Sequence, residues 1–155
     1  MLEAMRPPVF ETDVLVAVLG DFVRGGGGLL VAHDAVGMRQ HPAVFRHLVR
    51  GQGETDRVTT VTVAAAQHPV KAAMEPGQSF THAYYDHIPL QVGEGAVTVI
   101  ENEAGMPVIA CAEIGQGRYV ACGIALGLCQ ADADIRCGGQ ELALLWRGIR
   151  WPAGR

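Results

Sequence analysis

A run of four glycines that leads directly into an apolar segment is the feature that most restricts the fold of this chain. The stretch RGGGGLLVAHDA occupies residues 24–35, and its LLVA segment (29–32) is apolar without polar alternation. Such a run is typical of a strand that is covered on both faces. Residues 12–24 carry apolar side chains at helical spacing, so Gly25 is expected to end a helix. A helix that leads into a fully covered strand indicates a layered α/β sheet.

The four glycines are predicted to be structural, because they lie at the start of the strand. Ligands of open α/β sheets gather outside the carboxyl ends of the strands, which is the other end. The run also lacks the lysine and serine or threonine of a phosphate-binding loop, and it does not have the spacing of the dinucleotide fingerprint. The glycines therefore turn the chain from helix to strand, and no cofactor is predicted.

The remaining segments predict one domain over residues 1–155. Pro42 in the first turn and Gly51 at the end favour a second helix over 41–51, whereas residues 67–95 lose their periodicity and are expected to form a long, loop-rich segment. A closing helix is expected over 141–150, and strands are expected at 57–64, 96–100, 106–113 and 118–123. The turn EIGQG suggests a hairpin between the last two strands. The expected fold is therefore a three-layer α/β domain whose mainly parallel sheet is flanked by helices and carries a C-terminal antiparallel hairpin.

Composition excludes several classes of protein. The chain has 155 residues, of which 49% are hydrophobic and 18% charged, with a net charge of −4 and no dense lysine and arginine cluster, so nucleic acid is not an expected partner. No apolar run reaches the roughly 18 residues that cross a bilayer, and the first residues lack a secretory signal, so a cytoplasmic location is expected. The four cysteines show no zinc spacing, and Cys111 and Cys122 are expected to be buried, reduced thiols.

His33 and Asp34 are the first candidate functional residues, since they follow the LLVA strand directly. An imidazole titrates near neutral pH, so His33 is a candidate general base or a hydrogen-bond donor to a sugar hydroxyl or carbonyl. Asp34 is a candidate to orient His33 or to bind a hydroxyl. The structural alternative is that His33 only satisfies loop carbonyls while Asp34 caps the next segment.

A second concentration of polar residues falls in the loop segments QHPV and FTHAYYDH. His68, Tyr84, Tyr85 and Asp86 are expected to converge on the same rim as substrate-binding residues, where tyrosine rings and hydroxyls suit a carbohydrate. The structural alternative for the loop, and the favoured one for its two other histidines, His82 and His87, is a polar flap over the sheet edge. A metal held by His33, His68 and a carboxylate is a further alternative, but no paired-histidine spacing supports it, so no metal is predicted.

Four segments in order resemble the trehalose-utilisation (ThuA-like) domains of the class I glutamine amidotransferase-like superfamily. They are LGDFVRGGGGLLVAHDA, QHPV, MPVIACAEIGQGRYVACGIALG and LLWRGIRWPAG, which together extend from about residue 10 to the end. The resemblance implies an amidotransferase-like or flavodoxin-like α/β fold and a role in carbohydrate metabolism. Glutamine hydrolysis is not expected, because the position after LLVA holds His33 and no cysteine occurs before residue 111.

Two departures from the family pattern leave a choice of function. The resemblance leads us to expect a shortened form, a fragment or a domain that relies on a partner, because the family's front βαβ unit is not recognised before residue 12. The family's acidic pair and Gly-His correspond here to Tyr84, Tyr85 and Gly127-Leu128. The leading hypothesis is a protein that binds, and hydrolyses or isomerises, a sugar or keto-sugar. The alternatives are a non-catalytic binding or assembly module with a degenerate site and, more weakly, a metal-dependent hydrolase. A homo-oligomer or a partner chain is a candidate to cover the missing front strands.

Overall fold

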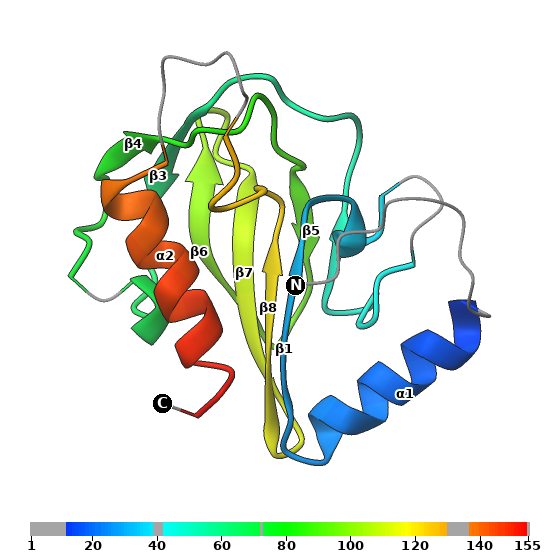
Figure 1. The fold of residues 1–155 in the computed structure, drawn as a ribbon. Helices are drawn as coiled ribbons and strands as arrows, with labels where there is room; N and C mark the ends of the chain where they lie inside the picture. Colours follow the sequence, from blue (N-terminus) through cyan, green and yellow to red (C-terminus); the bar gives the residue numbers. More distant parts are fainter. Residues whose placement is uncertain (1–11, 39–41, 72, 130–136, 155) are drawn as a thin grey trace.

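The computed structural model describes residues 12–38, 42–71, 73–129 and 137–154, which form two α-helices, two short 3₁₀ helices and eight strands (Figure 1). The helices are α1 (Thr12–Arg24) and α2 (Gly139–Arg150), and the 3₁₀ helices are η1 (His33–Val36) and η2 (Pro69–Lys71). The strands are β1 (Gly28–Ala32), β2 (Val49–Gly51), β3 (Thr60–Val63), β4 (Ser79–Thr81), β5 (Leu90–Val92), β6 (Ala96–Asn102), β7 (Pro107–Ile114) and β8 (Gly117–Cys122).

Six strands form one mixed sheet in the order β1-β8-β7-β6-β3-β4, and β2 and β5 form a separate antiparallel pair. In the six-stranded sheet of the described residues only β1 and β8 are parallel, and the other four pairings are antiparallel. The expectation of a mainly parallel sheet is therefore wrong, although the α/β class is confirmed. The reason is the length of the connections. Short turns join β6 to β7 and β7 to β8, whereas a parallel neighbour needs a crossover of a dozen residues or more.

Apolar side chains cover both faces of this sheet. On one face, Leu144 of α2 and Trp151 pack with residues of β3, β6, β7 and β8 around a core that includes Ile109 and Val120. On the other face, Val23 at the end of α1 and Phe45 pack against β1, β8 and the β2–β5 pair. Strand β1 is therefore covered on both sides, as its sequence predicts.

The glycine run and its neighbours allow backbones to approach closely. A Cβ atom added to Gly28 would lie 2.1 Å from the Pro152 carbonyl oxygen, and one added to Gly117 would lie 1.9 Å from the Val23 carbonyl oxygen. Real Cβ atoms do not come this near to backbone, so both positions require glycine. These glycines let α1, the start of β1 and the start of β8 pack together, which agrees with their predicted structural role.

One of two other local predictions is wrong. Residues 41–51 were expected to be helical, but residues 44–48 form turns and 49–51 form β2, which pairs with β5. Pairing with a distant segment overrides the helical pattern here, as tertiary context often does. The segment 67–95 was expected to be long and loop-rich, and its described residues are so, since they contain only η2 and the three-residue strands β4 and β5. Strands this short show too little alternation to be recognised.

The apolar stripes of both helices face solvent over much of their length. On α1 the exposed side chains include Val18 (59% exposed) and Phe22 (54%), and on α2 they include Trp146 (60%). Figure 1 shows α1 directed away from the sheet, with its C-terminal end at the base of β1. Both helices form where the apolar spacing predicts them. Within the described residues, however, no other part of the chain covers most of the apolar side chains on these two helix faces.

Candidate functional site

The first candidate residue, His33, has a strained backbone at the end of β1. Its φ angle is +49°, which is uncommon for a residue other than glycine. The chain continues from it into η1 and leaves that turn at Gly37, whose φ is 99°. Strained residues of this kind cluster at functional sites, because the surrounding structure must hold them in place. The conformation turns the imidazole out of the strand direction and toward the loop that holds Asp86.

The His33 imidazole lies between two carboxylates. Its Nε2 atom is 3.0 Å from Oδ1 of Asp86, and its Nδ1 atom is 3.4 Å from Oδ1 of Asp34. The Asp86 side chain is nearly inaccessible, whereas those of His33 and Asp34 are partly open. When Nε2–H donates to the buried Asp86 carboxylate, the ring is oriented and Nδ1 becomes the basic nitrogen. Asp86 therefore holds the orienting position that the sequence offered to Asp34.

Two tyrosines complete this cluster. The rings of His33 and Tyr84 meet edge to face with centroids 5.3 Å apart, and the Tyr84 and Tyr85 rings are 4.6 Å apart. Tyr85 is 41% exposed, so part of the aromatic surface is open to solvent. The structure thus gathers five of the predicted site residues: His33, Asp34, Tyr84, Tyr85 and Asp86. Their arrangement offers a general base, carboxylates for hydroxyl groups and an aromatic surface.

His68, the sixth predicted site residue, lies elsewhere. Its ring packs against Trp151 with centroids 4.5 Å apart, at the end of α2. Trp151 also accepts a hydrogen bond through its backbone oxygen from Arg118, which belongs to the start of β8. Burial lowers the pKa of His68, and Glu113 partly opposes that effect. His68 is therefore at the opposite end of the sheet from His33, and the expected convergence of His68 with the rim does not occur.

The two histidines of the loop, His82 and His87, are completely buried. Nε2 of His82 lies 3.4 Å from Nδ1 of His87, and Nε2 of His87 lies 3.5 Å from Oδ2 of Asp56. Burial, and then the neighbouring His87, lower the pKa of His82 to about 4. Burial also lowers the pKa of His87, with Asp56 opposing. Both rings are therefore uncharged at neutral pH. They pack inside the protein and support the loop there, and they do not form a polar flap over the sheet edge.

Glu141 also supports the loop, and sequence reasoning missed it. The side chain is 2% exposed, and its two oxygens accept hydrogen bonds from the backbone N–H groups of Ala83 (2.9 Å) and Gly127 (3.1 Å). It therefore links α2 to both the tyrosine loop and the segment after β8. The signal in the sequence is an acidic residue at the start of the closing helix. By itself this position indicates only a favourable interaction with the helix dipole.

Other reactive groups do not join this cluster. Cys111 and Cys122 are buried, as predicted, and burial raises the pKa of both thiols, that of Cys122 to about 12. Within the described ranges, no three histidine, cysteine, aspartate or glutamate side chains gather closely enough to hold a metal ion. The metal-dependent alternative therefore finds no ligand set in that part of the chain. The described helices also include none that is long and apolar enough to cross a membrane.

These features define an α/β protein with a histidine–aspartate pair at the carboxyl end of a buried strand. The family profile described as trehalose utilisation (ThuA) matches residues 6–151, and the chain belongs to that family. No curated protein sequence matches the chain.

Solved structures share the fold at low sequence identity. The chain is similar to cytoplasmic protein STM1381 from Salmonella typhimurium LT2, with a TM-score of 0.56, 14% identity, and coverage of 88% of this chain and 57% of that one. The N-terminal domain of mmIFT52 gives a TM-score of 0.65 at 15% identity, with 91% and 71% coverage. A β-galactosidase from Rahnella sp. R3 gives 0.58 at 13% identity, with 90% and 20% coverage. The chain therefore spans little more than half of STM1381 and a fifth of the β-galactosidase.

Proposed function

We propose that this protein binds a sugar or keto-sugar beside His33 and hydrolyses or isomerises it by proton transfer. The observation that carries the proposal is the His33–Asp86 pair, with 3.0 Å between Nε2 and Oδ1 and a strained φ at His33. A buried carboxylate that orients an imidazole is a recurring arrangement for general acid–base catalysis. Strain at the same residue is hard to account for if His33 only satisfies loop carbonyls.

The other members of the cluster have separate roles in this proposal. In a hydrolysis, His33 accepts at Nδ1 a proton from the water that attacks the anomeric carbon, and it gives that proton to the sugar oxygen that leaves. In an isomerisation, it moves a proton from the carbon next to the carbonyl to the carbonyl carbon, while the neighbouring hydroxyl proton passes to the carbonyl oxygen. Asp34, which faces that nitrogen, binds a neighbouring hydroxyl group. The Tyr84 and Tyr85 rings form the apolar wall against which a sugar face packs. Membership of a family described by trehalose utilisation supports a carbohydrate as the ligand.

A thermal-shift screen against mono- and disaccharides, including keto-sugars, tests this proposal. The informative variant is His33→Asn, because asparagine tolerates a positive φ and removes the imidazole. The exposed His47, which lies outside the cluster, provides the control His47→Asn. We expect a sugar to stabilise the parent and the control but not His33→Asn. A complete screen without a shift in the parent, or an equal shift in all three proteins, would refute the proposal.

A second candidate function is an assembly module that pairs with a second copy of the chain. The exposed apolar faces of α1 and α2 favour it, because the apolar helix faces of one copy can pack against those of another copy. In the described part of the sheet, β1 is also an edge strand, which is open to pairing with its counterpart across a twofold axis. Light scattering distinguishes this candidate: a dimer that Val18→Lys dissociates supports it, and a monomer at all concentrations excludes it.

A further inference from the structure

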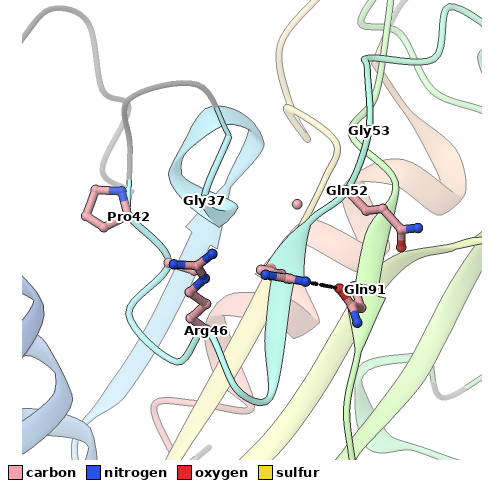
Figure 2. A pocket seen from close by; sticks show the side chains of 9 residues that line it. Gly37, Pro42, Arg46, Gln52, Gly53 and Gln91 are labelled. Atoms are coloured by element: carbon pink, nitrogen blue, oxygen red, sulfur yellow. Dashed lines mark hydrogen bonds between the residues drawn. The ribbon is translucent and has the colours of Figure 1, made fainter.

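A pocket of about 410 Å³ is lined by Gly37, the residue that follows η1, and by none of the five cluster residues, and it is not used in the proposal above. Figure 2 shows it between the segment that holds Gly37, Pro42 and Arg46 and the β2–β5 pair that holds Gln91. Its volume falls within the roughly 300–1,000 Å³ of small-molecule sites. The pocket is connected to the site through η1, which begins at His33, packs against β2 and is followed by Gly37.

Two arginines give the pocket its chemical character. Arg46 and Arg50 both line it, together with Gln52 and Gln91, and none of the described residues that line it is acidic. Figure 2 shows Arg46 on the opposite side of the pocket from Gln91. Within the described chain neither guanidinium forms an ion pair with a carboxylate. Two guanidinium groups at one small pocket, which no carboxylate of the described residues neutralises, therefore offer donors to a ligand.

The guanidinium of Arg50 is also fixed in place. Its Nε and Nη2 atoms donate to Oε1 of Gln91 at 2.8 and 2.6 Å. Gln91 is neutral, so it orients the guanidinium without cancelling its charge, and the Nη1 donors stay free of this contact. Fixing the donors in advance lowers the entropy that binding must overcome. Gln91 is therefore a positioning residue for Arg50.

Gly37 lets the arginine-bearing segment approach η1. Its φ of 99° favours glycine, and an added Cβ atom would lie 2.8 Å from the Cβ atom of Ala43. A larger residue would push the segment that carries Arg46 away from the histidine cluster. The local sequence thus connects the positive pocket to His33 through η1, whose C-cap is Gly37.

We propose that this pocket binds the oxyanion of the ligand, a phosphate or a carboxylate, so that the substrate class is an anionic sugar. The inference rests on the proposed function for the sugar part of the ligand, whereas the oxyanion part rests on Arg46 and Arg50 alone. Guanidinium groups bind these oxyanions through paired, charge-assisted hydrogen bonds. The chain as a whole has a net charge of −4, so a small anion is favoured over a polyanion such as nucleic acid.

Calorimetric titration of the whole chain tests the pocket. The probes are glucose 6-phosphate, glucuronate, neutral glucose and inorganic phosphate. The variants are Arg46→Ala and Arg50→Ala, with Arg57→Ala as a control that removes the same charge from an exposed position outside the pocket. We expect at least one anionic sugar to bind more tightly than glucose. Each pocket variant should weaken that binding about tenfold or more, and the control should change it by less than about twofold.

The four probes separate failure of the pocket from failure of the sugar site. Binding of inorganic phosphate that is lost with Arg50→Ala, without any sugar preference, supports the pocket and refutes the proposed sugar site. Equal binding of glucose and the anionic sugars, unaffected by both arginine variants, refutes the pocket and leaves the sugar site standing. Absence of binding by every anion in the parent also refutes the pocket. Loss of affinity in Arg57→Ala equal to that in Arg50→Ala would show a general charge effect and would overturn the inference.

Discussion

Because His82 is buried, we expect the protein to lose stability in mild acid. The single substitution His82→Gln should remove the part of this loss that His82 causes. His82 is fully buried and its Nε2 atom lies 3.4 Å from Nδ1 of His87. Burial, and then the like charge that His87 would carry, lower the pKa of His82 from 6.5 to about 4. An unfolded chain restores the ordinary value. Below pH 6.5 the unfolded state therefore binds a proton that the folded state does not, and the free energy of unfolding falls.

The size of this effect follows from the two pKa values. The difference between 6.5 and about 4 corresponds to about 3 kcal/mol once the pH is below both values. Between pH 7.5 and 5.0 the unfolded state takes up nearly a whole proton while the folded state takes up little, so His82 alone should cost about 2 kcal/mol over that interval. The stability is fully present above pH 6.5 and is lost as the pH falls toward 4.

Urea unfolding at pH 7.5 and 5.0 measures this loss. His82→Gln keeps a polar side chain and removes the titration, and His47→Gln makes the same change at an exposed position. We expect the parent and His47→Gln to lose about 2 kcal/mol more than His82→Gln between the two pH values. The comparison uses the change with pH, so a general destabilisation of His82→Gln does not affect it. An equal change in all three proteins would refute the role of His82.

Four further predictions concern the packing of the fold. Cys129 is exposed and Cys111 is buried with a raised pKa, so a thiol reagent should label Cys129 in the folded protein and reach Cys111 only after unfolding, as mass spectrometry of labelled peptides would show. Gly117→Ala should destabilise the protein by about 2 kcal/mol or more in urea unfolding, since its Cβ atom would collide with backbone. Gly20→Ala, inside α1 and near only a flexible arginine side chain, should instead be neutral or stabilising by up to about 1 kcal/mol. Glu141→Gln should weaken one buried and one partly buried hydrogen bond to the backbone, cost about 1–3 kcal/mol, and increase amide hydrogen exchange in the tyrosine loop.

Local patterns predicted the elements that are defined by their own residues. The helical spacing of 12–24, the apolar run of β1 and the apolar spacing of the closing helix are all found in the structure. Patterns failed where a distant segment decides the structure. Val49 lies in β2 because it pairs with Val92, more than 40 residues away, although its neighbours have a helical pattern. Sequence spacing also could not show that the apolar faces of α1 and α2 stay exposed, because burial depends on what packs against a helix.

The direction of two strands explains which predicted site residues meet. Strand β3 runs opposite to β6, which runs in the same direction as β1. The chain therefore leaves Val63, which is level with the end of β1, toward the end of the sheet at which β1 begins, and His68 lies in that direction, away from His33. Strand β4 reverses direction again, and the residues that follow it, including Asp86, return to the edge at which β1 ends. A mainly parallel sheet would have placed His68 at that edge too. The antiparallel direction of β3 takes His68 away from the candidate site, and the return of β4 brings Asp86 back to it. The orientation of β3 and β4 is thus the structural basis of the histidine–aspartate pair.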